Sequence, residues 1–268
     1  TDRSVIIIED YIDQYSLNNW KITRNEANIG WIQNFHRLFG ISTGDIIFPA
    51  DQDDIWLDDK VESMASVMER DPKVLVLGGN QILVDSDNKK KKIELLKWLK
   101  EKVKKPKEIN KLSLNNKFYL TQKPGCATCF KRDLLPYIKK MKIDDYSHDN
   151  IIWNIGYMFD GAYILQKDIV RYRRHPYSVW VKNNQNKNTS SRIHELEVRY
   201  KAMIAFKNLV IKNKPNQLDL IKEINNAINF FEFRLRLLKS RDLKMSIKLL
   251  AFINSYPRYR SYIADVLF

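Results

Sequence analysis

Apolar residues along the first 185 positions follow two alternating patterns, short continuous runs and longer segments with helical spacing. The short runs, which are typical of β-strands, lie at 20–23, 45–49, 74–78, 81–84, 126–130 and 162–172. The segments with helical spacing lie at 4–15, 28–38, 58–70, 132–141 and 149–159. This alternation predicts an α/β fold in which helices flank a sheet.

The pattern changes near residue 185, where the polar stretch NNQNKNTSS occupies 183–191. Three amphipathic segments without strand-type runs follow, at 191–213, 216–239 and 243–256. We therefore expect an α/β domain over residues 1–185 and an all-helical region over residues 186–268. The sequence contains no uninterrupted run of the roughly 18–20 apolar residues that span a bilayer.

The composition is that of a globular protein, with 44% hydrophobic and 29% charged residues among 268. It excludes collagen-like, low-complexity and broadly disordered chains. The net charge of +14 favours an anionic partner, such as a phosphorylated ligand, a nucleic acid or a membrane surface. The charge is uneven, because residues 1–85 carry −8 and residues 86–268 carry +22. This asymmetry argues against a chain that is coated with nucleic acid over its whole surface.

The two cysteines form one C-x-x-C motif, Cys126 to Cys129. A zinc site would need two more cysteine or histidine ligands at suitable spacing, and none lies nearby in the sequence. A redox pair would stand at the start of a helix, whereas this pair falls in an apolar run of strand type. We therefore expect the pair to be structural, and the low cysteine content favours a reducing, cytoplasmic setting.

Three aspartates, Asp51, Asp53 and Asp54, directly follow the apolar run at 45–49. Ligands bind beyond the carboxyl ends of the strands in an open α/β sheet, so these carboxylates stand where a ligand is expected. Adjacent like charges are costly unless a cation neutralises them, and carboxylate oxygens suit Mg²⁺ or Mn²⁺. The alternative is a solvated acidic turn that caps the next helix.

Five segments occur in an order that resembles a known enzyme family. They are NIGWIQNF (28–35), GDIIFPADQDDIWLDDKV (44–61), PGCATCFKRDLL (124–135), SHDNIIW (147–153) and YRRHPYS (172–178). Together they resemble the inverting GT-A glycosyltransferases of family 2, especially the bacterial rhamnosyltransferase-like branch. The resemblance covers residues 1–185, and it implies a Rossmann-like GT-A fold, a mixed sheet flanked by helices, with an all-helical C-terminal extension.

The activity that the resemblance implies is transfer of a sugar, with inversion, from a nucleotide-diphosphate sugar to a glycan or lipid-linked acceptor. Such enzymes serve bacterial cell-surface polysaccharide synthesis, and the DQDDIW segment leans towards dTDP-rhamnose as the donor. The implied cofactor is Mg²⁺ or Mn²⁺. The implied location is the cytoplasm, at the inner face of the cell membrane.

By position, the block Asp51–Asp54 resembles the DXD-type motif of this family. The resemblance implies that Asp53 and Asp54 hold the metal, with Asp54 favoured, and that Asp51 and Asp53 contact the nucleotide sugar. Trp56, which follows the block, is expected to pack rather than to bind.

Asn28, Gly30 and Asn34 resemble the family's segment that lines the nucleotide pocket. Asn28 and Gly30 are equally expected in a turn before a helix, where asparagine and glycine adopt conformations that other residues avoid. Both interpretations stay open from the sequence.

Asp149 resembles the family's general base, which takes the proton of the acceptor hydroxyl as that oxygen attacks the anomeric carbon. The alternative role for an aspartate at the start of a helix is to cap it. His148 would orient Asp149 or merely flank it, and Asp144 and Asp145 are lower-ranked acidic alternatives.

His175 resembles the family's histidine that ligates the metal or contacts the diphosphate, and neutral imidazole is a reasonable ligand for this role. Arg173 and Arg174 could pair with phosphate oxygens, although alternation along a strand points only one of them inward. Tyr177 and Trp180 could stack on a sugar or pack in a loop.

The family normally begins with a β-α-β unit that contributes half of the nucleotide pocket, and a D-G-S-x-D-like stretch precedes its helix. This chain begins at TDRS, which resembles the tail of that stretch. We therefore expect an N-terminally truncated catalytic domain that binds nucleotide sugar poorly and turns over little by itself.

The competing hypothesis is a non-catalytic basic module that binds a membrane surface or nucleic acid. The sequence shows no nucleic-acid reading motif, so nucleic acid is not an expected partner. The Lys-rich segment at 89–107 is typical of a solvated helix face. Aromatic and basic residues alternate at 230–239, which would suit a peripheral membrane contact, and a homodimer through the C-terminal helices fits equally.

Overall fold

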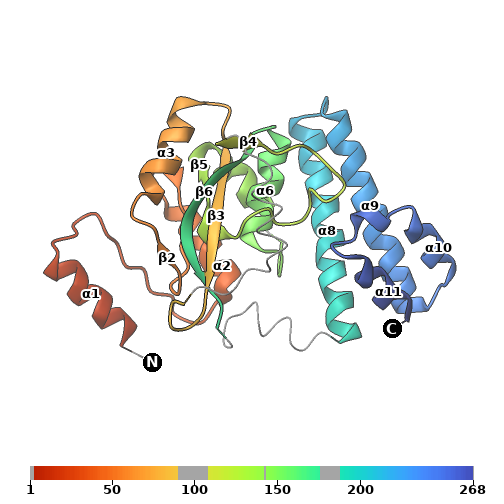
Figure 1. Cartoon of the computed structure of the whole chain (residues 1–268), viewed down its shortest axis with the longest axis horizontal. Helices are drawn as coiled ribbons and strands as arrows, with labels where there is room; N and C mark the ends of the chain where they lie inside the picture. Colours follow the sequence, from red (N-terminus) through yellow and green to blue (C-terminus); the bar gives the residue numbers. More distant parts are fainter. Residues whose placement is uncertain (1–2, 90–107, 142, 176–187, 268) are drawn as a thin grey trace.

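The computed structural model describes residues 3–89, 108–141, 143–175 and 188–267. Within these residues, six strands form one mixed sheet in the order β1-β5-β3-β6-β2, and β4 pairs with β6 (Figure 1). The strands are β1 (Ile46–Ile47), β2 (Ile55–Trp56), β3 (Val76–Val84), β4 (Ile109–Lys111), β5 (Thr128–Lys131) and β6 (Ala162–Arg173). The central strands β3 and β6 run parallel, and their described neighbours pair antiparallel.

The two faces of the sheet are covered by different helices. Helix α3 (Lys60–Arg70) packs on one face, whereas α2 (Gly30–Ile41), α5 (Leu135–Lys140) and α6 (His148–Met158) pack on the other. Successive residues of a strand point to opposite faces, so Val76 of β3 joins the core with α6 and Leu77 joins the core with α3. This layering is the predicted α/β architecture.

The C-terminal region is helical in its described part. It contains α8 (Thr189–Asn213), α9 (Leu218–Ser240), α10 (Lys244–Leu250) and α11 (Tyr259–Leu267), with the short 3-10 turn η3 (Ile253–Ser255) between the last two. Figure 1 shows α8 and α9 standing side by side next to the α/β part. The predicted boundary near 185 falls between β6 and α8, outside the described residues.

The α/β part and the C-terminal helices share one hydrophobic core. Phe118, before β5, lies 6.4 Å from Phe206 of α8 between ring centroids. Its neighbour Tyr119 lies 5.0 Å from Phe231 of α9, and its hydroxyl donates to the carbonyl of Ser255 in η3. Because these side chains are almost fully buried, the helical region covers apolar surface that the sheet domain would otherwise expose.

Several predicted elements differ in the structure. Residues 20–23 form no strand, because they are exposed and no other described strand pairs with them. The two predicted strands at 74–84 are one strand, β3, whose register with β6 shifts near Asn80. Cys126 lies in the 3-10 turn η1 (Gly125–Ala127) rather than in a strand.

The third predicted C-terminal helix, at 243–256, is two shorter elements, α10 and η3, and α11 follows them. The segment 90–107, which holds most of the predicted Lys-rich helix, lies outside the described residues. None of the described helices is long and apolar enough to cross a membrane.

The alternating aromatic and basic residues at 230–239 do not form the exposed apolar surface that a membrane contact would need. Phe230, Phe231, Leu237 and Leu238 of α9 are buried in the shared core. Helix α9 therefore uses its apolar face to pack on α8, α10 and α11, and that face is not available to a membrane.

Helix α1 (Ser4–Gln14) forms as predicted but contributes nothing to the core, since none of its residues is buried. Figure 1 shows it standing away from the sheet. Its apolar residues Ile6, Ile7 and Tyr11 are about half exposed.

Candidate active site

The acidic cluster lies in the loop between β1 and β2, beside the C-terminal end of β6. The backbone N–H of Arg173 in β6 donates to Asp54 Oδ1 at 2.8 Å. The thiol of Cys126 forms a second hydrogen bond with the Asp54 carboxylate. Potential ligand atoms of Asp51, Asp54 and Cys126 all lie within 4.8 Å of one another. The structure thus brings two of the three predicted aspartates together and adds a cysteine.

The carboxylates of this cluster crowd one another in a partly buried place. Burial raises the pKa of Asp51 to about 6, and the nearby charges of Asp54, Asp149 and Asp53 add to the shift. Burial also raises the pKa of Asp54, although its hydrogen bonds to Cys126 and Arg173 oppose the shift. A compact group of carboxylates with raised pKa values is typical of a site that binds a cation or moves protons.

One oxygen of the cluster is left without a partner. Asp54 Oδ2 is buried and makes no hydrogen bond to the part of the chain that the structure describes. Burial raises the pKa of the Cys126 thiol, so the sulfur stays protonated and acts as a hydrogen-bond donor. The oxygen donors that remain are carboxylates, the ligands that Mg²⁺ and Mn²⁺ prefer, so the residues fit the predicted metal.

Lys60, at the start of α3, lies beneath the acidic cluster and is completely buried. Its Nζ donates to the carbonyl of Cys126 at 2.6 Å and lies 3.6 Å from the ring centroid of Trp56. Burial lowers the pKa of Lys60 to about 8, although the charges of Asp54 and Asp51 oppose the shift. The predicted packing role of Trp56 agrees with this contact, whereas Lys60 was not among the residues that the sequence pattern singled out.

Asp53 points towards the end of β6 rather than towards Cys126. Its Oδ2 lies 3.0 Å from Nε2 of His175, the predicted partner in metal binding. Its carbonyl accepts a hydrogen bond of 2.8 Å from Nε of Arg173. Two of the predicted metal residues, Asp53 and His175, are therefore adjacent, whereas the third, Asp54, lies next to Asp51, which was predicted to contact the nucleotide sugar.

Arg173 and Arg174 are used differently. The guanidinium of Arg173 also donates to the carbonyls of Ser86 at 2.7 Å and Asp85 at 3.3 Å, so it holds the acidic loop and the turn after β3 together. The guanidinium of Arg174 lies over the ring of Tyr172, with 5.7 Å to its centroid. Phosphate binding by either arginine stays a prediction. Tyr177 and Trp180 lie outside the described residues.

Asp149 stands in the first turn of α6, close enough to the acidic loop to raise the pKa of Asp51. Its Oδ1 is buried and makes no hydrogen bond within the described residues. The cap position of α6 belongs to Ser147, so Asp149 does not cap the helix. A buried carboxylate oxygen without a hydrogen-bond partner among the described residues, on a residue whose charge reaches Asp51, suits the predicted base.

His148 is a packing residue in this structure. Its ring stacks on Phe35 of α2, with 3.9 Å between centroids, and a Cβ on Gly125 would come within 2.6 Å of its Nε2. Burial lowers its pKa, and neither ring nitrogen has a hydrogen-bond partner within the described residues. His148 therefore joins α2, α6 and η1 as a neutral aromatic ring.

Asn28, Gly30 and Asn34 form local turn contacts at the start of α2. Asn28 Oδ1 accepts from the N–H of Gly30 at 2.9 Å, and Gly30 has a φ of 75°, which favours glycine. Asn34 Oδ1 accepts from Nδ2 of Asn25 at 2.9 Å. These contacts account for the turn interpretation, and nucleotide binding by the three residues stays a prediction.

The lower-ranked acids lie apart from the cluster. Asp144 accepts a hydrogen bond of 3.2 Å from Gln33, and Asp145 lies 3.1 Å from His194 of α8. Both bonds are exposed, and Asp145 has a positive φ of 61°, as turn aspartates often have. Neither carboxylate contributes to the raised pKa values of Asp51 and Asp54.

The mixed sheet with helices on both faces is a fold of the GT-A class, and comparison with known proteins gives the family. The glycosyl transferase family 2 sequence model matches residues 1–134, half of the chain. The chain therefore belongs to glycosyl transferase family 2, as its motifs predicted. No curated protein matches the sequence.

Two solved structures of TarS residues 1–349 from S. aureus share the fold over 96% of this chain and 81% of theirs. The TM-score is 0.57 for TarS in complex with UDP-GlcNAc and 0.54 for TarS without it, each at 11% sequence identity. At this identity the similarity shows the fold, a GT-A sheet domain followed by a helical region.

Proposed function

We propose that this family 2 glycosyltransferase moves a sugar from a nucleotide-diphosphate sugar to a hydroxyl of a glycan or lipid-linked acceptor, with inversion. The observation that carries the proposal is the electrostatic grouping of Asp149 with Asp51, Asp53 and Asp54, which come from two distant segments. One acid is then available for the acceptor proton and the others for the donor.

Asp149 is the proposed base. Its buried Oδ1 is free to accept the proton of the acceptor hydroxyl. The hydroxyl oxygen then forms a bond with the anomeric carbon, the bond from that carbon to the diphosphate oxygen breaks, and the diphosphate departs with the electron pair. Attack opposite the departing group inverts the configuration of the anomeric carbon.

Asp54, Asp53 and Asp51 are the residues that would hold Mg²⁺ or Mn²⁺, with His175 next to Asp53. When bound, the ion would supply positive charge for the departing diphosphate. Lys60 holds the Cys126 carbonyl and supplies a fixed positive charge beneath Asp51 and Asp54. This charge lowers the cost of keeping the two carboxylates ionised before donor and metal arrive.

Two donors deserve direct comparison. TarS was solved in complex with UDP-GlcNAc, which makes that compound one candidate. The DQDDIW segment makes dTDP-rhamnose the other. Both leave a nucleoside diphosphate, so the proposed roles of Asp149 and the acidic cluster are the same for either donor.

The test is a panel of nucleotide sugars, including these two, with Mg²⁺, Mn²⁺ or EDTA. Calorimetry measures donor binding, and release of nucleoside diphosphate measures turnover. We expect Asp54→Ala to lose metal-dependent donor binding and Asp149→Asn to keep it. Turnover should fall by about 100-fold or more in Asp149→Asn, the range for loss of a general base.

Asp58→Ala is the matched control, because Asp58 is an exposed acid of the same segment. It should bind donor and turn over as the unchanged protein does. Full turnover by Asp149→Asn would show that another group accepts the proton. Equal donor binding in EDTA and in Mn²⁺ would remove the metal from the proposal.

A basic membrane-surface or nucleic-acid-binding module was the alternative function. That alternative gives no role to the partly buried carboxylates of Asp51 and Asp54, whose pKa values are raised. A cytoplasmic location, a peripheral membrane contact and a dimer through the C-terminal helices stay proposals beside the enzymatic one. The division into a catalytic domain at 1–185 and a helical region at 186–268 is also proposed.

A further inference from the structure

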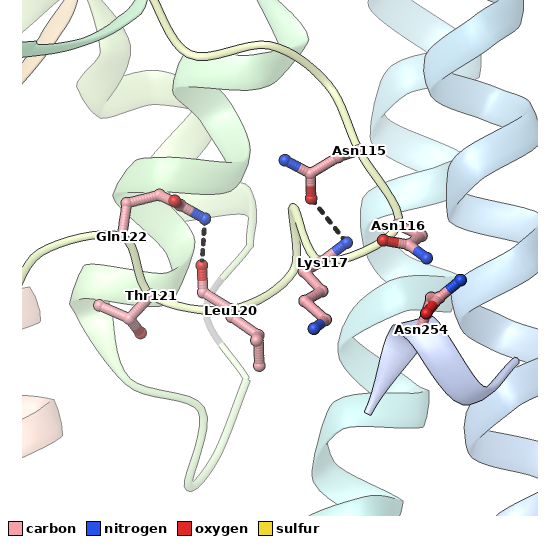
Figure 2. Close-up of a pocket in the computed structure, with 7 residues that line it drawn as sticks. All are labelled: Asn115, Asn116, Lys117, Leu120, Thr121, Gln122 and Asn254. Carbon is pink, nitrogen blue, oxygen red and sulfur yellow. Dashed lines mark hydrogen bonds between the residues drawn. The ribbon is translucent and has the colours of Figure 1, made fainter. Parts of the chain in front are cut away.

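A cavity of about 500 Å³ lies where the loop between β4 and η1 meets the C-terminal helices (Figure 2). Seven residues line it: Asn115, Asn116, Lys117, Leu120, Thr121, Gln122 and Asn254. Six come from the loop, and Asn254 comes from η3. The cavity is therefore built by both parts of the chain.

The two walls of the cavity are fixed to each other. The hydroxyl of buried Tyr119, in the loop, donates to the carbonyl of Ser255, which follows Asn254. Two contacts shape the loop wall itself, from Lys117 N to Asn115 Oδ1 at 2.8 Å and from Gln122 Nε2 to the Leu120 carbonyl at 2.8 Å (Figure 2). The cavity is therefore a formed site rather than a gap between mobile segments.

The cavity is open to solvent: Asn116 and Asn254 are exposed, Lys117 is half-buried, and their polar groups face the opening. Within the described residues, the side-chain amides of Asn116 and Asn254 and the Nζ of Lys117 have no hydrogen-bond partner in the protein. Each amide offers two N–H donors and a carbonyl acceptor, a combination that matches adjacent hydroxyl groups. The described lining holds no carboxylate and no aromatic ring.

This lining selects among ligand classes. A cation site would need oxygen ligands with negative charge, and a nucleobase site would need a stacking surface. A strongly apolar ligand would find only Leu120. A chain of hydroxyl groups, as in an oligosaccharide, can use both amides, and Lys117 accommodates any negative charge on it.

The cavity is connected to the candidate active site through one segment. Thr121 Oγ1 hydrogen-bonds to Oδ1 of Asn150, the residue after Asp149. Nε1 of Trp153, also in α6, donates to the carbonyl of Lys123 at 2.9 Å. The same segment continues into η1, whose Cys126 contacts Asp54.

We propose that this cavity is a carbohydrate-binding subsite for the part of an acceptor oligosaccharide that extends beyond the reacting hydroxyl. The assignment of the ligand as acceptor rests on the proposed function, whereas the carbohydrate class rests on the lining alone. The C-terminal region thereby contributes a binding residue, Asn254, to the enzyme.

Saturation-transfer NMR on the whole chain tests the subsite, with maltotriose, cellotriose, chitotriose and a rhamnose trisaccharide at about 10 mM, a level that detects millimolar affinity. We expect at least one trisaccharide to give a signal. That signal should fall at least about fivefold in Asn116→Ala/Asn254→Ala, which removes both amides, and in Asn254→Trp, which fills the cavity.

Asn216→Ala is the matched control, since Asn216 is exposed in the loop between α8 and α9 and lies outside the cavity. It should leave the signal unchanged. The subsite is refuted if no trisaccharide gives a signal, or if the signal survives in both cavity variants.

Calorimetric measurement of donor binding distinguishes a failure of the subsite proposal from a failure of the proposed transfer reaction. Loss of saccharide signal in the cavity variants, in a protein that shows neither binding nor turnover of any nucleotide sugar even at millimolar concentration, would uphold the subsite and reject the transfer reaction. Donor binding and turnover without any saccharide signal would uphold the transfer reaction and reject the subsite.

Discussion

At the scale of single residues, the acidic loop and its surroundings place carboxylates and a lysine in a partly buried environment, where each charge alone would destabilise the fold. Asp51 and Asp54 are drawn out of water and near each other, and Lys60 supplies the opposite charge from a fully buried position. Such an arrangement reduces the stability of the fold and suits the proposed binding of a cation.

The raised pKa of Asp51 predicts a pH dependence of stability. Its pKa is 3.8 in the unfolded chain and about 6 in the folded one. The folded state therefore binds more protons between these values, and this group's contribution to the free energy of unfolding falls as the pH rises through the window. Asp51→Asn should be more stable than the unchanged protein at pH 7.5, by up to about 3 kcal/mol, and equal to it below pH 4.

Urea denaturation in EDTA at both pH values measures this difference. Asp58→Asn is the control, because that aspartate is exposed in the same segment. Equal stability of the two variants at pH 7.5 would mean that ionised Asp51 costs the fold nothing.

At the scale of elements, helix α6 carries Asp149 and is held in place by its first residue. His148 fills the space between Phe35 of α2 and Gly125 of η1. Because η1 also carries Cys126, the position of the proposed base and the position of the acidic cluster depend on the same turn.

Gly125→Ala tests this dependence. The added Cβ would come within 2.6 Å of His148 Nε2, so the ring and the start of α6 must move. We expect a loss of about 1–3 kcal/mol in the free energy of unfolding, and a larger fall in kcat than in donor affinity.

Gly40→Ala provides the comparison, because a Cβ at Gly40 of α2 would meet nothing within 4 Å. It should leave turnover unchanged and stabilise the helix by roughly 0.5–1 kcal/mol. Equal effects of the two substitutions would show that His148 has room to move.

At the scale of the whole molecule, the C-terminal helices are joined by one buried carboxylate. Asp265 of α11 is fully buried and accepts hydrogen bonds from Arg192 of α8, Arg234 of α9 and the Tyr256 hydroxyl. The ion pair from Arg234 Nε measures 2.5 Å. Four segments therefore meet at one side chain.

Asp265→Asn should cost about 3–5 kcal/mol, because it leaves two partly buried arginines, Arg192 and Arg234, without their fully buried counter-charge. Asp242→Asn removes a more exposed partner, 2.9 Å from Arg236, and should cost less than about 1 kcal/mol. Thermal unfolding of both variants measures the difference. A small loss for Asp265→Asn would show that solvent reaches this centre.

Much of the fold was predictable from patterning, and the exceptions have physical causes. The helices at 4–15, 28–38 and 149–159 follow from apolar spacing, with ends shifted by no more than three residues. The strand β2 was missed because two residues carry no periodic signal, and the expected strand at 20–23 failed because no partner strand is described beside it.

The candidate site was predictable only in part. Adjacent aspartates after an apolar run mark a loop that can be read from sequence, and Asp149 followed from the family motif. Lys60 was missed because a lysine at the start of an amphipathic helix normally lies in solvent. Cys126 was assigned a structural role, and its contact with Asp54 depends on a turn 72 residues away, which local patterns do not encode.

The hydrogen bonds between Arg173 and the acidic loop determine which changes to that loop an engineered variant can tolerate. The guanidinium of Arg173 donates hydrogen bonds to the carbonyls of Asp53, Asp85 and Ser86, and its backbone N–H donates to the carboxylate of Asp54. Insertions or deletions in the loop would break the hydrogen bonds of Arg173. Gln52 is exposed in the same loop and can be substituted without changing those hydrogen bonds. Efforts to retune donor preference can therefore vary the chemistry of this loop at constant length.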